Sequence, residues 1–399
     1  MTGVVFPRQL PPSGAEVTQG LDLENLGVLH AGPEERFDRI ALLARQIFDV
    51  AGAGIALLNG ERPFLKAAVG LGPANSAEAT TLAQIAMSHS GAHVVEDVPP
   101  DAGLGMLTQQ RAIRFYAGQP VTSPGGAHIG NLFVVGHRSR TFSERDAKML
   151  AELKWWVDRE LRQSVELDQA AEVQRKLMPE RRPNIPGYEF AAVCVPCRGV
   201  GGDFFDWYTT PRGLAITVGD VMGKGIGAAM VMAAACSIMR AAGRLYPPAK
   251  AVEFADTALR DELESTGRMI TVCHGELSPE THTVCYVDAG HGLIMAMNAD
   301  GTVRPRPVGM GSLPLGVLPG ERRPQMTVTI GPGEVALIFS DGLLDLYDGT
   351  IASLDPIARV VRACADQGAA AIVDHFAQRA KDGVLSDDVT VCVIRRNPL

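Results

Sequence analysis

The stretch from Phe142 to Met178 contains neither glycine nor proline, and it lies near the middle of the chain. Ser143 and Asp146, three positions later, resemble the capping box that opens a helix. Pro179 then ends the pattern. A helix of this length would be about 54 Å long, which is too long for the interior of one domain. The sequence therefore predicts a connector helix over residues 142–178, with a domain on either side.

An apolar stripe follows the predicted connector helix. Leu150, Leu153, Val157, Leu161 and Val165 recur three or four positions apart, which places them on one helical face. Such a face either pairs with a second copy of the chain or packs on the chain's own domains. We favour the first alternative and expect a homodimer.

Length and charge limit the protein class. With 399 residues the chain is long enough for two domains. A net charge of -8 argues against nucleic acid or an anionic membrane as partner. The most apolar helical run, 228–239, is shorter than the roughly 20 residues of a membrane span. Residues 1–21 resemble a flexible tail rather than a signal peptide, so we expect a cytoplasmic protein.

The segment before the connector alternates between helical and strand patterns. Residues 34–50 form an amphipathic helical pattern, and "GIALLNG" and "FLKAAVGL" are typical of strands. "AIRFYAGQPVTSPGGAHIGNLFVVGH" is typical of two strands around a Gly-Gly turn. These elements predict an α+β module with a central antiparallel sheet.

Four segments carry a resemblance to a known sensory domain. "PEERFDRI", "IRFYAGQPV", "GGAHIGNLFVV" and "FSERDAKMLAELKWWVDREL" resemble a GAF domain over residues 22–165. The resemblance implies a sensory role and leaves open a small-molecule ligand. His89 and His93 are candidates to line its pocket, although lone histidines are more often surface or core residues. No cysteine precedes Cys194, so a tetrapyrrole could not be attached covalently to this domain.

The segment after Pro186 is rich in apolar strands. The predicted strands are 188–195, 213–218, 269–277, 283–287, 293–297, 335–339 and 389–394. The predicted helices are 226–242, 251–264 and a pair within 355–381. Grouped strands separated by paired helices predict sheets covered by helices, a layered α+β domain.

Aspartates recur at the ends of these predicted strands. Asp203 follows the first strand, Asp220 and Asp341 each end a later one, and Asp387 and Asp388 precede the last. If these carboxylates converge, their mutual repulsion requires a compensating cation. A set of oxygen ligands without histidine or cysteine favours Mg²⁺ or Mn²⁺ over zinc. The sequence therefore predicts a site for divalent cations.

Seven cysteines lie between Cys194 and Cys392. An odd number in a chain without an export signal favours reduced thiols. Cys194 and Cys197 form a lone C-x-x-C, which we interpret as ordinary core or near-surface residues.

Six motifs in order carry a second and more specific resemblance. "GVGGDFFDW", "GDVMGKGIGAAM", "DAGHG", "LPLGV", "FSDGLLD" and "SDDVTVCVI" resemble the SpoIIE-like branch of the PPM family of metal-dependent serine/threonine phosphatases. The resemblance covers residues 170–396, because "AAEVQRKLMPE" is similar to the family's entry helix. It implies an α-β-β-α sandwich over residues 179–399, with a dinuclear metal centre at one edge.

The resemblance also implies the metal ligands. Asp220 matches the carboxylate that bridges both cations, and Asp203 with the backbone carbonyl of Val221 matches the ligands of one of them. Asp341 and Asp387 match the ligands of the other. Asp388, the neighbour of Asp387, is the second choice at its position.

Other residues near these motifs have weaker assignments. Arg198 lies at the offset of a phosphate-binding arginine in eukaryotic relatives. Asp206 is a turn or strand cap, or a contact of the metal or its water. Lys224 and His291 are candidates for the proton donor, although His291 fits a structural role in its turn. Glycines 201, 202, 223, 225 and 227 would let backbone and phosphate approach the cations.

We therefore expect a GAF-regulated protein phosphatase in which two Mn²⁺ or Mg²⁺ ions activate water. The resemblance implies a phosphorylated STAS-domain antagonist of an anti-sigma factor as substrate. Helix 226–242, directly after the Asp220 loop, is the expected mechanical link to the sensory domain. The alternatives are an inactive signalling scaffold and a phosphatase of a small metabolite.

Overall fold

The computed structural model describes residues 34–59, 62–71, 91–99, 113–123, 125–304 and 311–398. The predicted tail 1–21 and His89 lie outside these residues. The chain divides into two compact units, Met1–Gln169 and Ala170–Leu399, and each is described by itself.

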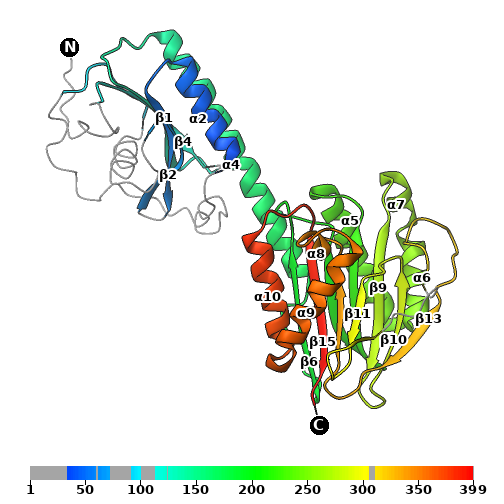
Figure 1. The fold of residues 1–399 in the computed structure, drawn as a ribbon. Helices are drawn as coiled ribbons and strands as arrows, with labels where there is room; N and C mark the ends of the chain where they lie inside the picture. The colour runs from blue at the N-terminus through cyan, green and yellow to red at the C-terminus, as the bar shows by residue number, and fades with distance from the viewer. Residues whose placement is uncertain are drawn as a thin grey trace. The chain divides into compact units, whose positions relative to one another are not determined.

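Within the described residues, the N-terminal unit contains an antiparallel sheet and the helices α2 and α4 (Figure 1). Its strands are β1 (Gly52–Asn59), β2 (Arg62–Val69), β3 (His93–Val95), β4 (Phe115–Thr122) and β5 (His128–Gly136), in the order β2-β1-β5-β4-β3. Helix α2 (Glu35–Ile47) packs on this sheet through Phe37, Ala41 and Ala44. The predicted α+β module with a central antiparallel sheet is confirmed within the described residues.

Helix α4 (Glu144–Leu177) is the predicted connector, and the boundary between the two compact units falls inside it. The capping box is confirmed, because the Ser143 hydroxyl accepts from the Asp146 N–H at 3.2 Å and donates to the Asp146 carboxylate at 2.7 Å. The helix ends at Leu177, two residues before Pro179.

The apolar stripe on α4 does not form a free seam. Leu150, Leu153, Val157 and Leu161 are at most 5 % exposed and belong to the core of the N-terminal unit. The expectation that this stripe pairs with a second copy is wrong for these residues. Helical spacing identifies an apolar face, but it does not tell which surface covers that face.

The C-terminal unit contains two five-stranded sheets. The first has the order β13-β10-β9-β8-β7 and consists of β7 (Phe204–Thr210), β8 (Gly213–Val221), β9 (Ile270–Ser278), β10 (Thr283–Ala289) and β13 (Gln325–Thr329). The second has the order β12-β11-β14-β15-β6 and consists of β6 (Tyr188–Val195), β11 (Ile294–Met297), β12 (Val303–Arg304), β14 (Val335–Phe339) and β15 (Val389–Arg396).

Helices cover the outer faces of both sheets (Figure 1). Helices α5 (Ile226–Leu245), α6 (Pro248–Ala258) and α7 (Arg260–Thr266) share a core with β8, β9 and β10. Helices α8 (Gly342–Asp345), α9 (Leu354–Cys364) and α10 (Ala369–Asp382) pack on β6, β14 and β15. A third core, with Trp207, Ile216 and Ile338, fills the space between the sheets. The predicted α-β-β-α layering is therefore observed.

Strands β12 and β13 and helix α8 were not predicted, and two further details also differ from the sequence prediction. Strand β7 was not predicted, although its sequence "FFDWYTT" is rich in the aromatic and β-branched residues that favour strands. Asp203 follows β6, as predicted, but it lies directly before β7. The predicted helix 251–264 is two helices, because α6 ends at Ala258 and α7 begins at Arg260.

Helix α5 is longer than the apolar run that the sequence suggested. It has 20 residues, and by length and composition it is the one helix among the described residues that could cross a bilayer. Met232, Ala235 and Met239 on α5 are buried against the sheet of β8 and β9. This burial is typical of a core helix.

Candidate metal centre

Strand ends and the loops beside them bring the predicted aspartates together. Asp220 lies near the end of β8, and Asp203 directly precedes the adjacent antiparallel strand β7. In the other sheet, Asp341 follows β14 and Asp387 precedes its antiparallel neighbour β15. The antiparallel pairing brings the end of one strand beside the start of the next in each sheet. Asp203 therefore lies beside Asp220 in one sheet, and Asp387 lies near Asp341 in the other.

The pKa values of these carboxylates are raised by their burial and by the negative charges of their neighbours. Burial and the negative charges of Asp341 and Asp387 raise the pKa of Asp220 to about 7. Burial, followed by the charge of Asp220, also raises the pKa of Asp203 well above its usual value. The pKa of Asp341 is raised by burial and by Asp387. Each carboxylate thus disfavours ionisation of its neighbours, and a cation would reverse that effect.

Asp203 gives the clearest sign of a missing positive charge. Its side chain is 2 % exposed, and its Oδ2 atom is buried without a hydrogen-bond partner among the described residues. A buried polar atom without a partner is costly in a folded protein, so a ligand or ion is expected there.

Asp206 lies near Asp203 in the sequence, but its negative charge is compensated by an arginine. It is 3 % exposed, and its Oδ2 accepts a hydrogen bond from Arg240 Nε on α5 at 2.6 Å. Burial raises the pKa of Asp206, and the bond from Arg240 opposes that shift. Asp206 therefore connects β7 to α5. It does not contribute to the acidic centre, the name used here for Asp203, Asp220, Asp341 and Asp387.

Asp388 accepts hydrogen bonds from the backbone of the loop between β6 and β7. Its Oδ1 accepts from the Cys197 N–H at 2.8 Å, and its Oδ2 accepts from the Gly202 N–H at 2.7 Å. The approach is so close that a Cβ on Gly201 would lie 2.0 Å from Asp388 Oδ2. Asp388 therefore holds the loop that carries Asp203, which explains why this position requires glycine.

The carbonyl of Val221 lies beside the same glycine loop. A Cβ on Gly202 would lie 2.4 Å from the Val221 oxygen, and the Val221 N–H donates to the Gly202 carbonyl at 3.3 Å. Because Gly202 has no side chain, the space beside the Val221 oxygen stays open, whereas the Cβ of any other residue would fill it. This arrangement fits the predicted role of a backbone ligand.

Two cationic side chains lie at the rim. Lys224 Nζ is 2.9 Å from Asp387 Oδ2 and also donates to the Ser386 carbonyl, and the bond to Asp387 raises the pKa of Lys224. Arg198 is exposed, and its positive charge acts on Lys224. Lys224 is therefore paired with one carboxylate of the centre, whereas Arg198 is linked to it only through its charge effect on Lys224.

Cys197 is a neighbour of the centre that the sequence prediction missed. Its Sγ and carboxylate oxygens of Asp387 and Asp388 lie within 4.8 Å of one another. Burial and Asp388 raise the pKa of the Cys197 thiol, which favours the neutral form. All seven cysteines are free thiols, as predicted. The spacing to the "DD" motif is almost 200 residues, so no local pattern links them.

The two described histidine candidates lie in structural settings. His291 is 6 % exposed, and its ring Nδ1 lies 3.1 Å from the Thr271 hydroxyl. Its backbone N–H donates to the Asp288 carboxylate. His93 lies in β3, with its ring 6.0 Å from that of Tyr116. The position of His291 agrees with the structural role expected for the "AGHG" turn.

The donor set fits hard divalent cations. Carboxylate oxygens of Asp203, Asp220, Asp341 and Asp387, with one carbonyl oxygen, are ligands that Mg²⁺ and Mn²⁺ prefer. Within the described residues, none of these four carboxylates forms an ion pair with arginine. The acidic centre can therefore accept positive charge from solution.

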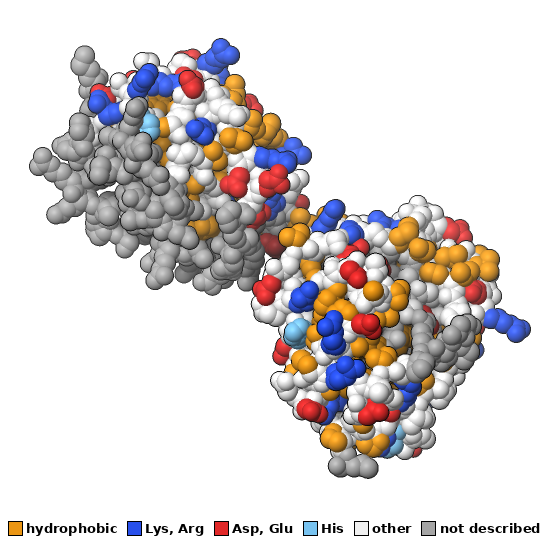
Figure 2. All heavy atoms as spheres, viewed as in Figure 1, with side chains coloured by type: hydrophobic (Ala, Val, Ile, Leu, Met, Phe, Trp, Pro, Cys, Tyr) orange, Lys and Arg blue, Asp and Glu red, His pale blue; other side chains and the backbone are white. Residues whose placement is uncertain are grey.

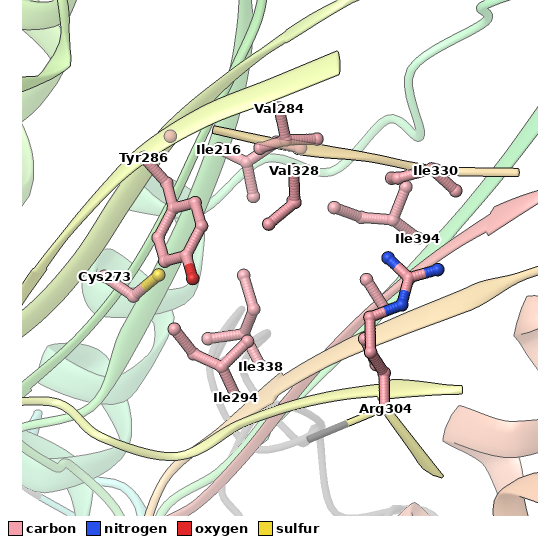
Figure 3. Close-up of a pocket in the computed structure, with 13 residues that line it drawn as sticks. Ile216, Cys273, Val284, Tyr286, Ile294, Arg304, Val328, Ile330, Ile338 and Ile394 are labelled. Carbon is pink, nitrogen blue, oxygen red and sulfur yellow. The ribbon is translucent and has the colours of Figure 1, made fainter. Parts of the chain in front are cut away.

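A separate cavity of about 90 Å³ lies between the two sheets (Figure 3). It is lined mainly by apolar side chains, among them Ile216, Tyr286, Val328 and Ile338, and none of the acidic-centre residues lines it. Arg304 lies at its edge in Figure 3 and forms an ion pair with Glu334. This cavity is not part of the acidic centre.

Comparison with known proteins agrees with this geometry. Residues 210–397 match the family model described as stage II sporulation protein E (SpoIIE). This segment includes Asp220, Asp341, Asp387 and Asp388, whereas Asp203 precedes it.

Two curated proteins are similar over part of the chain. "Protein IcfG" of Synechocystis sp. is 25% identical over 240 residues, which cover 51% of this chain and 36% of that protein. "Phosphoserine phosphatase RsbU" of Bacillus subtilis is 23% identical over 252 residues, which cover 60% of this chain and 72% of that protein. The chain thus matches only about a third of the length of one of these relatives.

A solved structure shows the fold. The SiaA-PP2C domain of Pseudomonas aeruginosa superposes with a TM-score of 0.50 and 22% identity, covering 58% of this chain and 95% of that domain. The observed sandwich is therefore a PP2C-type fold.

Proposed function

Because the C-terminal unit is a SpoIIE-type phosphatase domain of the PPM class of protein serine/threonine phosphatases, we propose that the chain hydrolyses phosphoserine or phosphothreonine in a protein. Two divalent cations would be held by Asp203, Asp220, Asp341, Asp387 and the Val221 carbonyl. The observation that carries this proposal is the cluster of Asp203, Asp220 and Asp341, whose pKa values are raised by desolvation and by neighbouring negative charges, with no arginine partner in the described structure.

The residues divide the work of the reaction. When bound, the two cations would neutralise the phosphoryl oxygens and activate water for in-line attack. Asp220 would be one of the carboxylates that hold the cations, while Asp388 holds the loop of Asp203 in place. We propose Arg198 as a contact of the phosphoryl group and Lys224, which pairs with Asp387, as a candidate proton donor. Either side chain could also stabilise the negative charge that develops on the leaving oxygen.

The surface near the centre supports a protein substrate. Met222, Ile226, Met230 and Met269 lie in or beside the loop after Asp220 and are between 36% and 70% exposed. Figure 2 shows apolar side chains gathered on the surface of the C-terminal unit. Exposed methionine and isoleucine are typical of protein-binding surfaces. We propose a phosphorylated STAS-domain antagonist of an anti-sigma factor as the substrate.

For the N-terminal unit we propose a GAF-type sensory role, with a small molecule as the candidate ligand. The five-stranded antiparallel sheet with α2 and α4 supports this assignment. The signal would reach the phosphatase domain through α4 and α5. We place the protein in the cytoplasm on its sequence alone.

We also propose a homodimer, with a contact surface different from the buried stripe. Trp155 and Trp156 on α4 are 49% and 47% exposed, and Ile47 on α2 is 46% exposed. Leu43 of α2 and Trp156 line one shallow cavity between these helices. Changing both tryptophans to serine should convert a dimer to a monomer in sedimentation equilibrium, and a wild-type monomer would contradict the proposal.

The proposed function is tested by phosphate release from a phosphoserine protein in the presence of Mn²⁺. Release that depends on the metal, with at least tenfold preference over small phosphorylated metabolites, would support it. Release from metabolites alone would favour the metabolite phosphatase. If Mn²⁺ binds but no substrate turns over, with or without residues 1–141, the scaffold alternative is favoured.

A further inference from the structure

One polar side chain in the last turns of α4 contacts the loop that carries Asp203. Gln174 is 7 % exposed, its Nε2 donates to the Gly201 carbonyl at 2.7 Å, and its Oε1 accepts from the Gly201 N–H at 3.1 Å. The amide of one helix residue therefore satisfies both backbone groups of a loop residue. All of these atoms belong to the same compact unit.

Gly201 belongs to the loop that delivers a metal ligand. Asp203 is two residues further on, and the intervening Gly202 donates its N–H to Asp388 Oδ2 at 2.7 Å. The loop is thus held from one side by the Gln174 amide and from the other by the Asp388 carboxylate. Two adjacent glycines give this loop much conformational freedom, so its shape depends on these bonds.

We propose that Gln174 is a positioning residue, which holds the Gly201–Asp203 loop in the arrangement that binds the divalent cation. The inference rests on the proposed function only in the identity of the centre as a metal site. Gln174 would contact neither the cation nor the substrate. It acts through Gly201 on the direction of the Asp203 carboxylate.

The chemistry of the side chain explains the choice of residue. The terminal amide carries a donor and an acceptor on two neighbouring atoms, which suits the N–H and C=O of one residue, Gly201. Without it, both backbone groups would be buried and unpaired, which is costly enough to move the loop. A methionine has nearly the same shape but forms neither bond.

A second contact fixes the end of the same helix. The Leu177 carbonyl, in the last turn of α4, accepts a hydrogen bond from Arg240 Nη2, and Arg240 also pairs with Asp206. The register of α4 against the phosphatase core is therefore set by Arg240. Gln174 transmits that register to the loop of Asp203.

The test is Mn²⁺ binding to the full chain, measured by calorimetry without any substrate. Gln174→Met should weaken Mn²⁺ binding about tenfold or more, as is typical when a residue that orients a ligand is removed. Gln169→Met is the matched control, because Gln169 is an exposed residue on the same helix. Gly201→Ala, which displaces the loop against Asp388, gives the size of a full disruption.

Equal Mn²⁺ affinity in Gln174→Met and Gln169→Met, within a factor of two, would overturn the proposal. Thermal unfolding of the metal-free variants shows whether each is folded. If Gln174→Met does not fold, the unmutated chain still gives an answer. Because coupling is reciprocal, Mn²⁺ should slow amide hydrogen exchange in segment 170–178. Unchanged exchange in that segment would likewise contradict the inference.

These outcomes separate the inference from the proposed function. A chain that binds Mn²⁺ with the expected dependence on Gln174 but hydrolyses no phosphoserine protein would support the positioning role and contradict the proposed activity. If the wild type is active but Gln174→Met leaves the Mn²⁺ affinity unchanged, the result would support the proposed activity and contradict the positioning role.

Discussion

Asp256 and Asp203 are both buried carboxylates of the C-terminal unit, at 5 % and 2 % exposure, but they are balanced differently. Asp256 accepts from the buried Arg323 at 3.0 Å and from the Gly316 N–H at 2.8 Å. Asp203 lies among other carboxylates, and its Oδ2 has no partner in the described structure. The first arrangement supports the fold by itself, whereas the second requires an ion from solution.

The largest expected effect concerns the proposed bridging ligand. Asp220→Asn should lower Mn²⁺-dependent phosphate release at least about 1,000-fold, because the cations and the attacking water would lose their shared ligand. Asp300→Asn, which changes an exposed turn residue, should leave the rate within about twofold. Residual activity in Asp220→Asn near the wild-type rate would show that the acidic centre is not the catalytic site.

The second prediction contrasts the two kinds of carboxylate through stability. Asp256→Asn should lower the free energy of unfolding by about 3 kcal/mol, because it leaves the Arg323 guanidinium buried and uncompensated. Asp203→Asn should instead stabilise the metal-free chain, because it removes a repelling charge. Urea unfolding in EDTA measures both. Loss of stability in both variants would remove the distinction.

The third prediction uses pH to separate the two kinds. The raised pKa of Asp220, about 7 in the folded chain, means that the native state retains a proton that the unfolded state releases near pH 4. The contribution of Asp220 to the stability of the metal-free chain should therefore fall as the pH rises from about 4 to about 7, by up to about 4 kcal/mol.

Asp220→Asn should flatten this dependence, and saturating Mn²⁺ should abolish it. Thermal unfolding across that pH range, with EDTA or with Mn²⁺, gives the comparison. A wild-type chain whose metal-free stability rises over the same range would contradict the assignment of a repelling cluster.

The smallest expected effect concerns Lys224, the cation already present at the rim. Its ammonium neutralises Asp387 at 2.9 Å, and a divalent cation would compete with it. Lys224→Met should therefore strengthen Mn²⁺ binding about threefold, because the pair is partly exposed and weak. Calorimetry measures this change, and weaker binding in the variant would indicate that Lys224 assists the metal instead.

Local patterns predicted much of this molecule. The connector helix, its capping box and most strands follow from spacing and composition, and the aspartates were identified because each lies at the boundary of an apolar strand. Asp206 and Asp203 are only three residues apart, yet one faces Arg240 and the other the acidic centre. The sequence left a metal contact open for Asp206, because its partner Arg240 is 34 residues away on another element.

The remaining features depend on contacts between distant segments. Gln174 is one of several polar residues on a long helix, and only the fold brings it to Gly201. Cys197 reaches Asp388 across 191 positions. The stripe from Leu150 to Leu161 was correctly identified as apolar, but its partner surface is the sheet of its own unit. Periodicity defines a face, whereas tertiary packing decides what covers it.

Helix α4 is continuous across the boundary between the units, and this continuity has a torsional consequence. An α-helix turns by about 100° per residue, so each residue added near position 169 rotates everything upstream about the helix axis relative to Gln174. Seven added residues complete almost two full turns and nearly restore the original angle. Any signal carried by this helix must therefore depend on helical phase rather than on linker length alone. The expected period is about seven residues.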